Sequence, residues 1–174
     1  MNDYDNSLKQ ITQTLKNINA SLNDIDLNMN DENFFDKSIN IYGLINYTRN
    51  QFLPKTSSFI TDNHAFNDIF FNYTSVESMI LDLFLIIESD LIKALDKNTG
   101  QLLDSEKINS IIAFSHNLFE LLSSIIYTRI NLNNKIISDD EYAILNKKYN
   151  HEIFNMQNNF YKLVYDEKID FRVK

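Results

Sequence analysis

The run Met79-Ile80-Leu81-Asp82-Leu83-Phe84-Leu85-Ile86-Ile87 decides the fold of this chain. All of its residues except Asp82 are apolar, so a helix formed by this run would be apolar on every side. Such a helix is stable in water only when other helices surround it. We therefore expect this run to be the central helix of the protein.

The rest of the composition supports a helical fold. The chain has 174 residues, of which 44% are hydrophobic and 23% charged, and this is enough for one ordinary globular core. It has only two glycines and one proline, whereas sheet proteins need many residues that turn sharply. The sequence predicts one all-α domain over residues 1–174. This domain would be a bundle of five to six helices, and one arrangement of these helices is two packed three-helix bundles.

Apolar residues at steps of three and four predict the helices on either side of the central one. The first seam consists of Leu8, Ile11, Leu15, Ile18, Leu22, Ile25 and Met29. The second consists of Phe35, Ser38, Ile41, Tyr42, Ile45, Arg49 and Phe52. The third consists of Ile108, Ile111, Ile112, Ser115, Leu118, Phe119, Leu122, Ile125, Ile126 and Arg129. The last consists of Tyr142, Leu145, Tyr149, Ile153, Met156, Phe160 and Leu163.

Capping residues predict where several helices begin. Thr74-Ser75-Val76-Glu77 and Ser138-Asp139-Asp140-Glu141 have the spacing of a capping box, and Asp104 or Ser105 can start the helix between them. Asp31 or Asn33 can begin the second helix, and Asp62 a short aromatic segment.

Glycine, proline and loop-like segments predict where helices end. The second helix is expected to end before Pro54 and to be followed by a loop over 55–63. Gly100 can end the central helix, and 131–137 would be the loop that follows the next one.

Charge and composition exclude several classes of partner and location. The net charge of −8 opposes binding to phosphate backbones and anionic lipid, so we expect no nucleic-acid partner. The absence of cysteine excludes disulfides. The first residues lack a basic segment followed by an apolar one, which indicates no secretory signal. The longest apolar run is far shorter than the roughly 20 residues that span a bilayer. We therefore expect a cytoplasmic protein.

Tests for known catalytic and metal-binding motifs find none. His116 and Glu120 lie four residues apart on one helix, but the glutamates that a di-iron bundle needs three residues before its histidines are replaced by Ala113 and Lys148. The sequence has no glycine-rich phosphate loop. We therefore expect no enzymatic activity, no cofactor, no metal and no small-molecule substrate, and we interpret His116 and Glu120 as a surface pair. A helical enzyme that uses this pair is the least favoured alternative.

Asp82 is the one carboxylate inside the central apolar run. A charge in such a place is costly unless it is paired or reaches water. The sequence leaves three explanations: an ion pair with Arg49 or Arg129, a position at the edge of the helix in contact with solvent, or a carboxylate with a function.

Three segments resemble the cytoplasmic domain of the DotU (TssL) family of type VI secretion systems. They are Ile41 to Arg49, Ile80 to Glu88, and Leu118-Phe119-Glu120-Leu121-Leu122 continuing to Arg129. The family's Asp-Glu pair is Ile87-Glu88 here, and its usual proline and Gly-Phe turn are absent.

This resemblance implies a scaffold in the bacterial inner-membrane complex. It would bind an IcmF-like (TssM) partner and baseplate proteins, with Glu88 as a contact and Asp90 as a neighbour. The family's location is the cytoplasmic face of the inner membrane, which would require a transmembrane helix beyond Lys174. Self-association remains open.

A second class of function is a viral or phage helical inhibitor that binds a partner helix in a groove, as Bcl-2-like proteins do. The sequence lacks the tryptophan and the glycine of that family's Asn-Trp-Gly-Arg turn. A helical peptide bound beside the central helix would favour this alternative.

Overall fold

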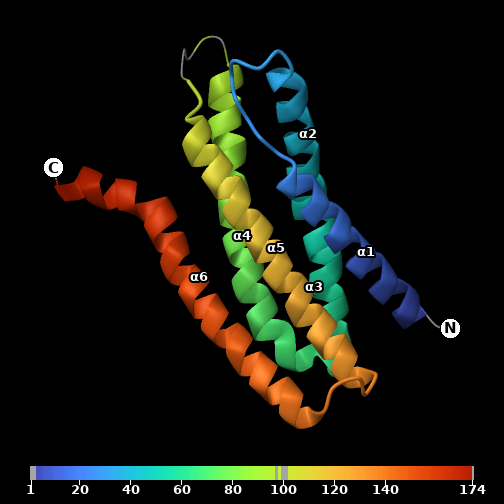
Figure 1. Ribbon diagram of the computed structural model, residues 1–174. Coiled ribbons are helices and arrows are strands. Elements are labelled where there is room, and N and C mark those ends of the chain that lie inside the picture. Colours follow the sequence, from blue (N-terminus) through green and yellow to red (C-terminus); the bar gives the residue numbers. More distant parts are fainter. Residues whose placement is uncertain (1–2, 97, 99–101, 174) are drawn as a thin grey trace.

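The computed structural model is an all-α bundle, as the sequence predicts (Figure 1). It describes the backbone of residues 3–96, 98 and 102–173, and the side chains of residues 6–96, 98 and 102–165. Within these residues the order is α1 (Asp3–Asn23), α2 (Phe34–Tyr47), the π-helical turn η1 (Thr48–Phe52), α3 (Leu53–Asp62), the 3₁₀ helix η2 (His64–Ile69), α4 (Phe70–Leu95), α5 (Ser105–Asn133) and α6 (Asp139–Val173).

The elements α2, η1 and α3 follow one another without a break and form one long rod from Phe34 to Asp62. The predicted end before Pro54 and the loop over 55–63 are therefore wrong. Pro54 lies in the first turn of α3, where a missing amide costs no intrahelical hydrogen bond, and the π-helical turn before it shifts the hydrogen-bond register. The buried face of the rod consists of Phe34, Ser38, Ile41, Ile45, Thr48, Phe52, Leu53, Thr56 and Ile60.

Two of the predicted helix starts are wrong. Helix α4 begins at Phe70, so Thr74 lies inside it and its hydroxyl donates to the carbonyl of Phe71 at 2.9 Å. The 3₁₀ turn of η2 leads directly into α4 and makes a capping box at Thr74 unnecessary. Asp62 is the last residue of α3 and caps nothing that follows. Asn33 occupies the N-cap of α2 but forms no capping hydrogen bond through its side chain.

The other two starts are confirmed. Asp104 caps α5 by accepting from the amide of Lys107 at 3.1 Å. At α6 the amide of Glu141 donates to Ser138 Oγ at 3.1 Å, and the amide of Ser138 donates to Glu141 Oε1 at 3.4 Å. These reciprocal bonds form the predicted capping box. The predicted stop at Gly100 lies outside the described residues; α4 ends at Leu95, and α5 continues to Asn133.

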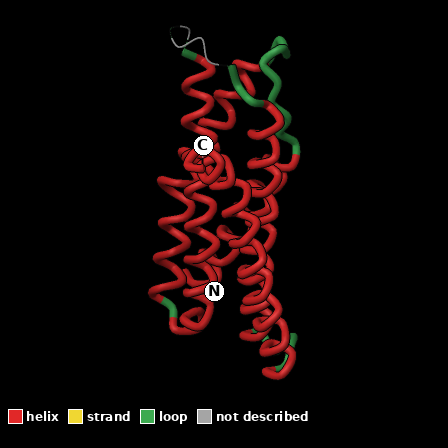
Figure 2. The backbone as a smooth tube through the Cα atoms, turned by 90° about the vertical axis from the view of Figure 1, so that its left-hand side faces the viewer, coloured by secondary structure: helices red, strands yellow, loops and turns green. Residues whose placement is uncertain are grey.

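Helices α4 and α5 form the centre of the bundle. Helix α4 packs against the rod, η2, α5 and α6, while α5 also packs against α1 (Figures 1 and 2). The buried apolar side chains form one cluster around this pair. The expectation that α4 is covered on all sides is only partly correct, because Leu85 and Ile92 are more than half exposed.

Within the described residues, α5 is the one helix long and apolar enough to span a membrane by length and composition. More than half of its most apolar window, 56%, is buried inside the bundle. A core helix of a bundle satisfies the same criteria, so this finding gives no separate indication of a membrane.

Candidate functional site

Glu88 forms an ion pair that connects α4 to the rod. Its Oε2 atom lies 2.9 Å from Arg49 Nη2, and the same guanidinium nitrogen donates to Asn46 Oδ1 at 2.9 Å. The hydroxyl of Tyr42 donates to the backbone carbonyl of Glu88 at 3.2 Å. Both partners of the ion pair remain in contact with solvent. The predicted contact residue is thus accessible and also has a partner within its own chain.

Exposed apolar side chains lie along the rod and α4, the same two elements as this ion pair. Phe35 and Ile39 precede Tyr42 by seven and three residues and so lie on the same side of α2. Leu85 and Ile92 lie one turn on either side of Glu88 along α4. The two helices run in opposite directions (Figure 1), and the exposed fractions of the four side chains are 59%, 52%, 59% and 52% in the order named. We call this surface, Phe35, Ile39, Leu85 and Ile92 around Arg49 and Glu88, the Glu88 face.

Tyr42 lies at the centre of the Glu88 face and is half-buried. Partial burial raises the pKa of its phenol, and the negative charge of Glu88 raises it further. The phenol therefore stays neutral in the physiological range and keeps its proton as a hydrogen-bond donor.

Asp90 faces a hollow between α4, α5 and α6, at whose edge Leu85 of the Glu88 face also lies. Two residues along a helix correspond to a rotation of about 200°, so Asp90 lies on the opposite side of α4 from Glu88. Its Oδ2 atom is 3.7 Å from Lys107 Nζ on α5. The sequence grouped Glu88 and Asp90 as neighbours, whereas the structure separates them.

Asp82 forms no ion pair with either candidate arginine, because Arg49 pairs with Glu88 and Arg129 with Asp68. The side chain is exposed and lines a small hollow together with Gln157 and Tyr161 of α6. The explanation that places Asp82 at a solvent-exposed edge is confirmed, and the ion pair is wrong.

Arg129 connects three elements at the opposite end of the bundle from the α1–α2 loop. Its Nε atom is 3.2 Å from Asp68 Oδ1 and also donates to the carbonyl of Ala65, both in η2. The guanidinium lies 5.3 Å from the ring centre of Tyr142, whose hydroxyl donates to Asp68 Oδ2 at 2.6 Å. Burial and the Asp68 carboxylate raise the pKa of Tyr142. This network joins η2, α5 and α6.

His116 and Glu120 form the predicted pair, with Nε2 and Oε1 2.9 Å apart. In the part of the chain that the structure describes, no group of three or more histidine, cysteine, aspartate or glutamate side chains is placed to hold a metal ion. The pair therefore has no third ligand among these residues.

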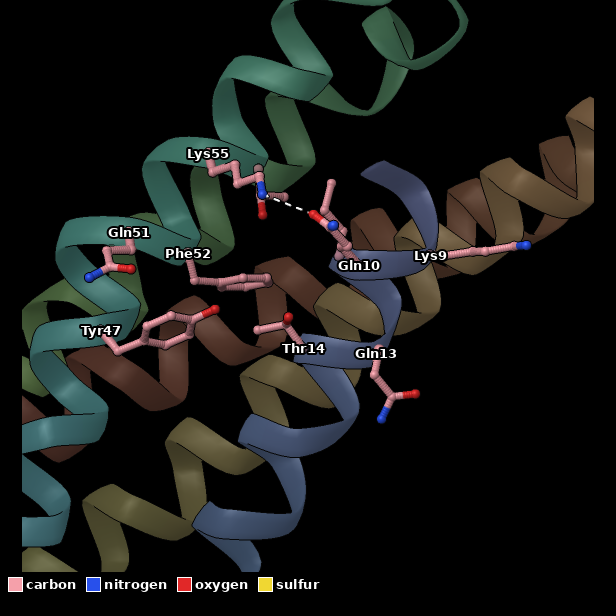
Figure 3. A pocket seen from close by; sticks show the side chains of 10 residues that line it. Lys9, Gln10, Gln13, Thr14, Tyr47, Gln51, Phe52 and Lys55 are labelled. Atoms are coloured by element: carbon pink, nitrogen blue, oxygen red, sulfur yellow. Dashed lines mark hydrogen bonds between the residues drawn. The ribbon is translucent and has the colours of Figure 1, made fainter. Parts of the chain in front are cut away.

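Sequence reasoning missed a groove between α1 and the rod. A hollow of about 470 Å³ lies between Gln10 and Thr14 on one side and Phe52 and Lys55 on the other. Figure 3 shows Tyr47 and Phe52 pointing from the rod toward α1, and the bond from Lys55 Nζ to Gln10 Oε1, 3.0 Å long, crossing between the two walls.

A second hollow of about 580 Å³ continues the first toward the other end of α1. It is lined by Ser21, Asp24, Ile25, Asp26, Lys37, Asn40, Ile41, Leu44 and Tyr47. Tyr47 lines both hollows and stands between them, and we call the two hollows together the α1–α2 groove. The signal that could have revealed it is Leu44 and Tyr47, apolar residues that lie off the buried seam of α2.

Comparisons with protein-family models, with curated proteins and with solved structures find no match to this chain.

Proposed function

We propose that this protein is a non-enzymatic scaffold that binds other proteins through the Glu88 face. The supporting observation is the combination of four exposed apolar side chains with a solvent-accessible arginine–glutamate pair on the same two elements, the rod and α4. Apolar side chains with arginine at the centre and polar groups at the rim are typical of protein interfaces.

The resemblance to the DotU family suggests the partner. Under that proposal the Glu88 face binds the cytoplasmic part of an IcmF-like (TssM) protein, in an assembly that also includes baseplate components. Because an incoming charged group can compete for either member of the Arg49–Glu88 pair, the pair would set the orientation of the partner.

The test is to measure the affinity of the IcmF-like cytoplasmic domain from the same source for four proteins: the wild type, Glu88→Arg, the swap Arg49→Glu/Glu88→Arg, and Asp90→Arg. We expect Glu88→Arg and the swap to weaken binding by at least about tenfold, a loss of about 1.4 kcal/mol. Asp90→Arg is the matched control, because it reverses a charge on the same helix two residues away but on the opposite side.

The swap separates binding from folding. It keeps opposite charges in the 49–88 pair, so its thermal midpoint should stay close to that of the wild type while its affinity falls. Unchanged affinity in Glu88→Arg and the swap, or an equal loss in Asp90→Arg, would reject the Glu88 face as the binding surface.

A further inference from the structure

The α1–α2 groove lies on the other side of α2 from the Glu88 face. On α2, Leu44 and Tyr47 are rotated by roughly half a turn from Phe35 and Tyr42. The two surfaces therefore share no side chain, and a ligand in the groove need not displace a partner on the Glu88 face.

The groove has the length and lining of a site for a helix. From Lys9 to Asp24, α1 rises about 22 Å, which equals the length of a helix of about 15 residues. The apolar side chains Ile25, Leu44 and Tyr47 line its middle and one end, and Tyr47 is an exposed aromatic of the kind that anchors interfaces. The other end is lined mainly by polar residues, and there the bond from Lys55 to Gln10 crosses the groove, so the apolar side of a bound helix contacts the Tyr47 and Leu44 part. Amphipathic helices bind in grooves of this type by their apolar side.

The charges at the two ends of the groove differ in sign. Lys55 lies at one end, with Lys9 nearby on the outer side of α1 (Figure 3). Asp24 and Asp26 lie at the other end, where Lys37 is already paired with Asp31 at 3.3 Å. A bound helix is therefore favoured when its acidic end lies near Lys55 and its basic end near Asp24.

The helix dipole selects the direction. Acidic residues stabilise the N-terminus of a helix and basic residues its C-terminus. A stable helix with the complementary charges would then place its N-terminus near Lys55 and run parallel to α1. We propose that the α1–α2 groove binds an amphipathic helix of another protein, with an acidic first turn and a basic last turn, parallel to α1.

A second copy of this chain fits less well. The outward side of α1 is polar, with Gln13, Lys16 and Asn17 exposed, so it could not fill an apolar groove. The outward side of α6 carries exposed Ile144, Phe154 and Tyr161, but α6 and α1 lie on opposite sides of the bundle (Figure 1). Pairing them would join two different surfaces head to tail, whereas the commonest oligomers are two-fold dimers that pair the same surface of both copies.

The experiment uses two synthetic 15-residue peptides with the same leucine stripe, each held helical by a side-chain lactam bridge. One has glutamates in its first turn and lysines in its last, and the other has these charges exchanged. Binding of each labelled peptide to the full chain is followed by fluorescence anisotropy. We expect the first peptide to bind at least about tenfold more tightly than the second.

Variants of the chain then locate the site. The double variant Asp24→Lys/Lys55→Glu exchanges the charges of the two ends at exposed positions and should reverse the preference. Leu44→Lys should abolish binding of both peptides, and Ile39→Lys on the Glu88 face should leave it unchanged. If Leu44→Lys does not fold, the double variant at the two exposed positions still tests the site through the reversal of the peptide preference.

Three results would overturn the proposal. They are equal affinity for the two peptides, equal binding by the Leu44→Lys variant in its folded form, and self-association of the wild type that Leu44→Lys abolishes. Failure of this proposal and failure of the Glu88 face are distinguishable. The groove is tested with the two peptides and the Ile39→Lys control, and the Glu88 face is tested with a different partner.

Discussion

Two arginine–carboxylate pairs in this molecule have opposite surroundings. Arg129 is 17% exposed and contacts the carbonyl of Ala65, the ring of Tyr142 and Asp68, which is itself 42% exposed, so three groups from two other elements hold the guanidinium. Arg49 is 32% exposed, and its pair with Glu88 lies among apolar side chains that nothing in the described chain covers. The comparison teaches that the surroundings of an ion pair, not the pair itself, separate a structural contact from a candidate binding surface.

The largest expected effect is the loss of the Arg129 network. Arg129→Met keeps much of the side-chain volume but removes the donor to Asp68 Oδ1 and to the Ala65 carbonyl, while the Tyr142 hydroxyl still donates to Asp68 Oδ2. Because Asp68 is in contact with water, part of the loss is compensated, and we expect a decrease of about 1.5–2 kcal/mol in the free energy of unfolding. Urea denaturation followed by circular dichroism measures it; a loss below that of Arg49→Met would contradict the comparison.

The capping box of α6 should contribute less. Ser138→Ala removes the acceptor of the Glu141 amide and should lower the free energy of unfolding by about 1 kcal/mol. Ser138→Asp, which restores an acceptor at the N-cap, is the control and should recover most of the loss. Equal destabilisation by both substitutions would show that the hydrogen bond is not the cause.

The Arg49–Glu88 pair should contribute least to stability and most to binding. Because both groups are in contact with water, Arg49→Met should cost about 0.5–1 kcal/mol in the free energy of unfolding. Its effect on binding to the IcmF-like domain should exceed this value. If the loss in stability instead equals that of Arg129→Met, the Glu88 face is a structural contact of the same kind as the Arg129 network.

Glu77 is a third carboxylate to compare with Asp68 and Glu88. It is half-buried and is not paired with an arginine of the described chain. Burial raises the pKa of Glu77 above its ordinary value, with the hydroxyl of Tyr73 acting in the opposite direction, and no ion pair of the described residues includes Glu77. A carboxyl whose pKa is raised on folding binds its proton more tightly in the folded state, so the free energy of unfolding falls as the pH rises through the window between the two pKa values.

The variant Glu77→Gln replaces the ionisable carboxyl with a neutral amide. It should be more stable than the wild type at about pH 7, where the wild-type carboxyl is ionised. The difference should shrink toward about pH 4, as the carboxyl becomes protonated in both states. Thermal midpoints at the two pH values measure it. A variant that is less stable than the wild type at neutral pH would mean that the carboxylate has a stabilising partner.

The sequence by itself determined the helical fold and most of its seams. Steps of three and four, together with the scarcity of glycine and proline, allow little except packed helices, and Asp104 and Ser138 mark starts because a capping hydrogen bond depends only on residues within one turn. The family resemblance singled out Glu88 as a partner contact, but the sequence could not show that Arg49 lies beside it, since 39 residues separate them.

Only the tertiary structure decided the features that depend on contacts distant in sequence. The helix passes Pro54 because a π-helical turn changes the register before it, and α4 starts at Phe70 because η2 leads into it. Glu88 and Asp90 separate because Glu88 pairs with Arg49 of the rod and Asp90 with Lys107 of α5. The α1–α2 groove arises where two helices of different parts of the chain meet, and periodicity within one segment carries no information about the space between two segments.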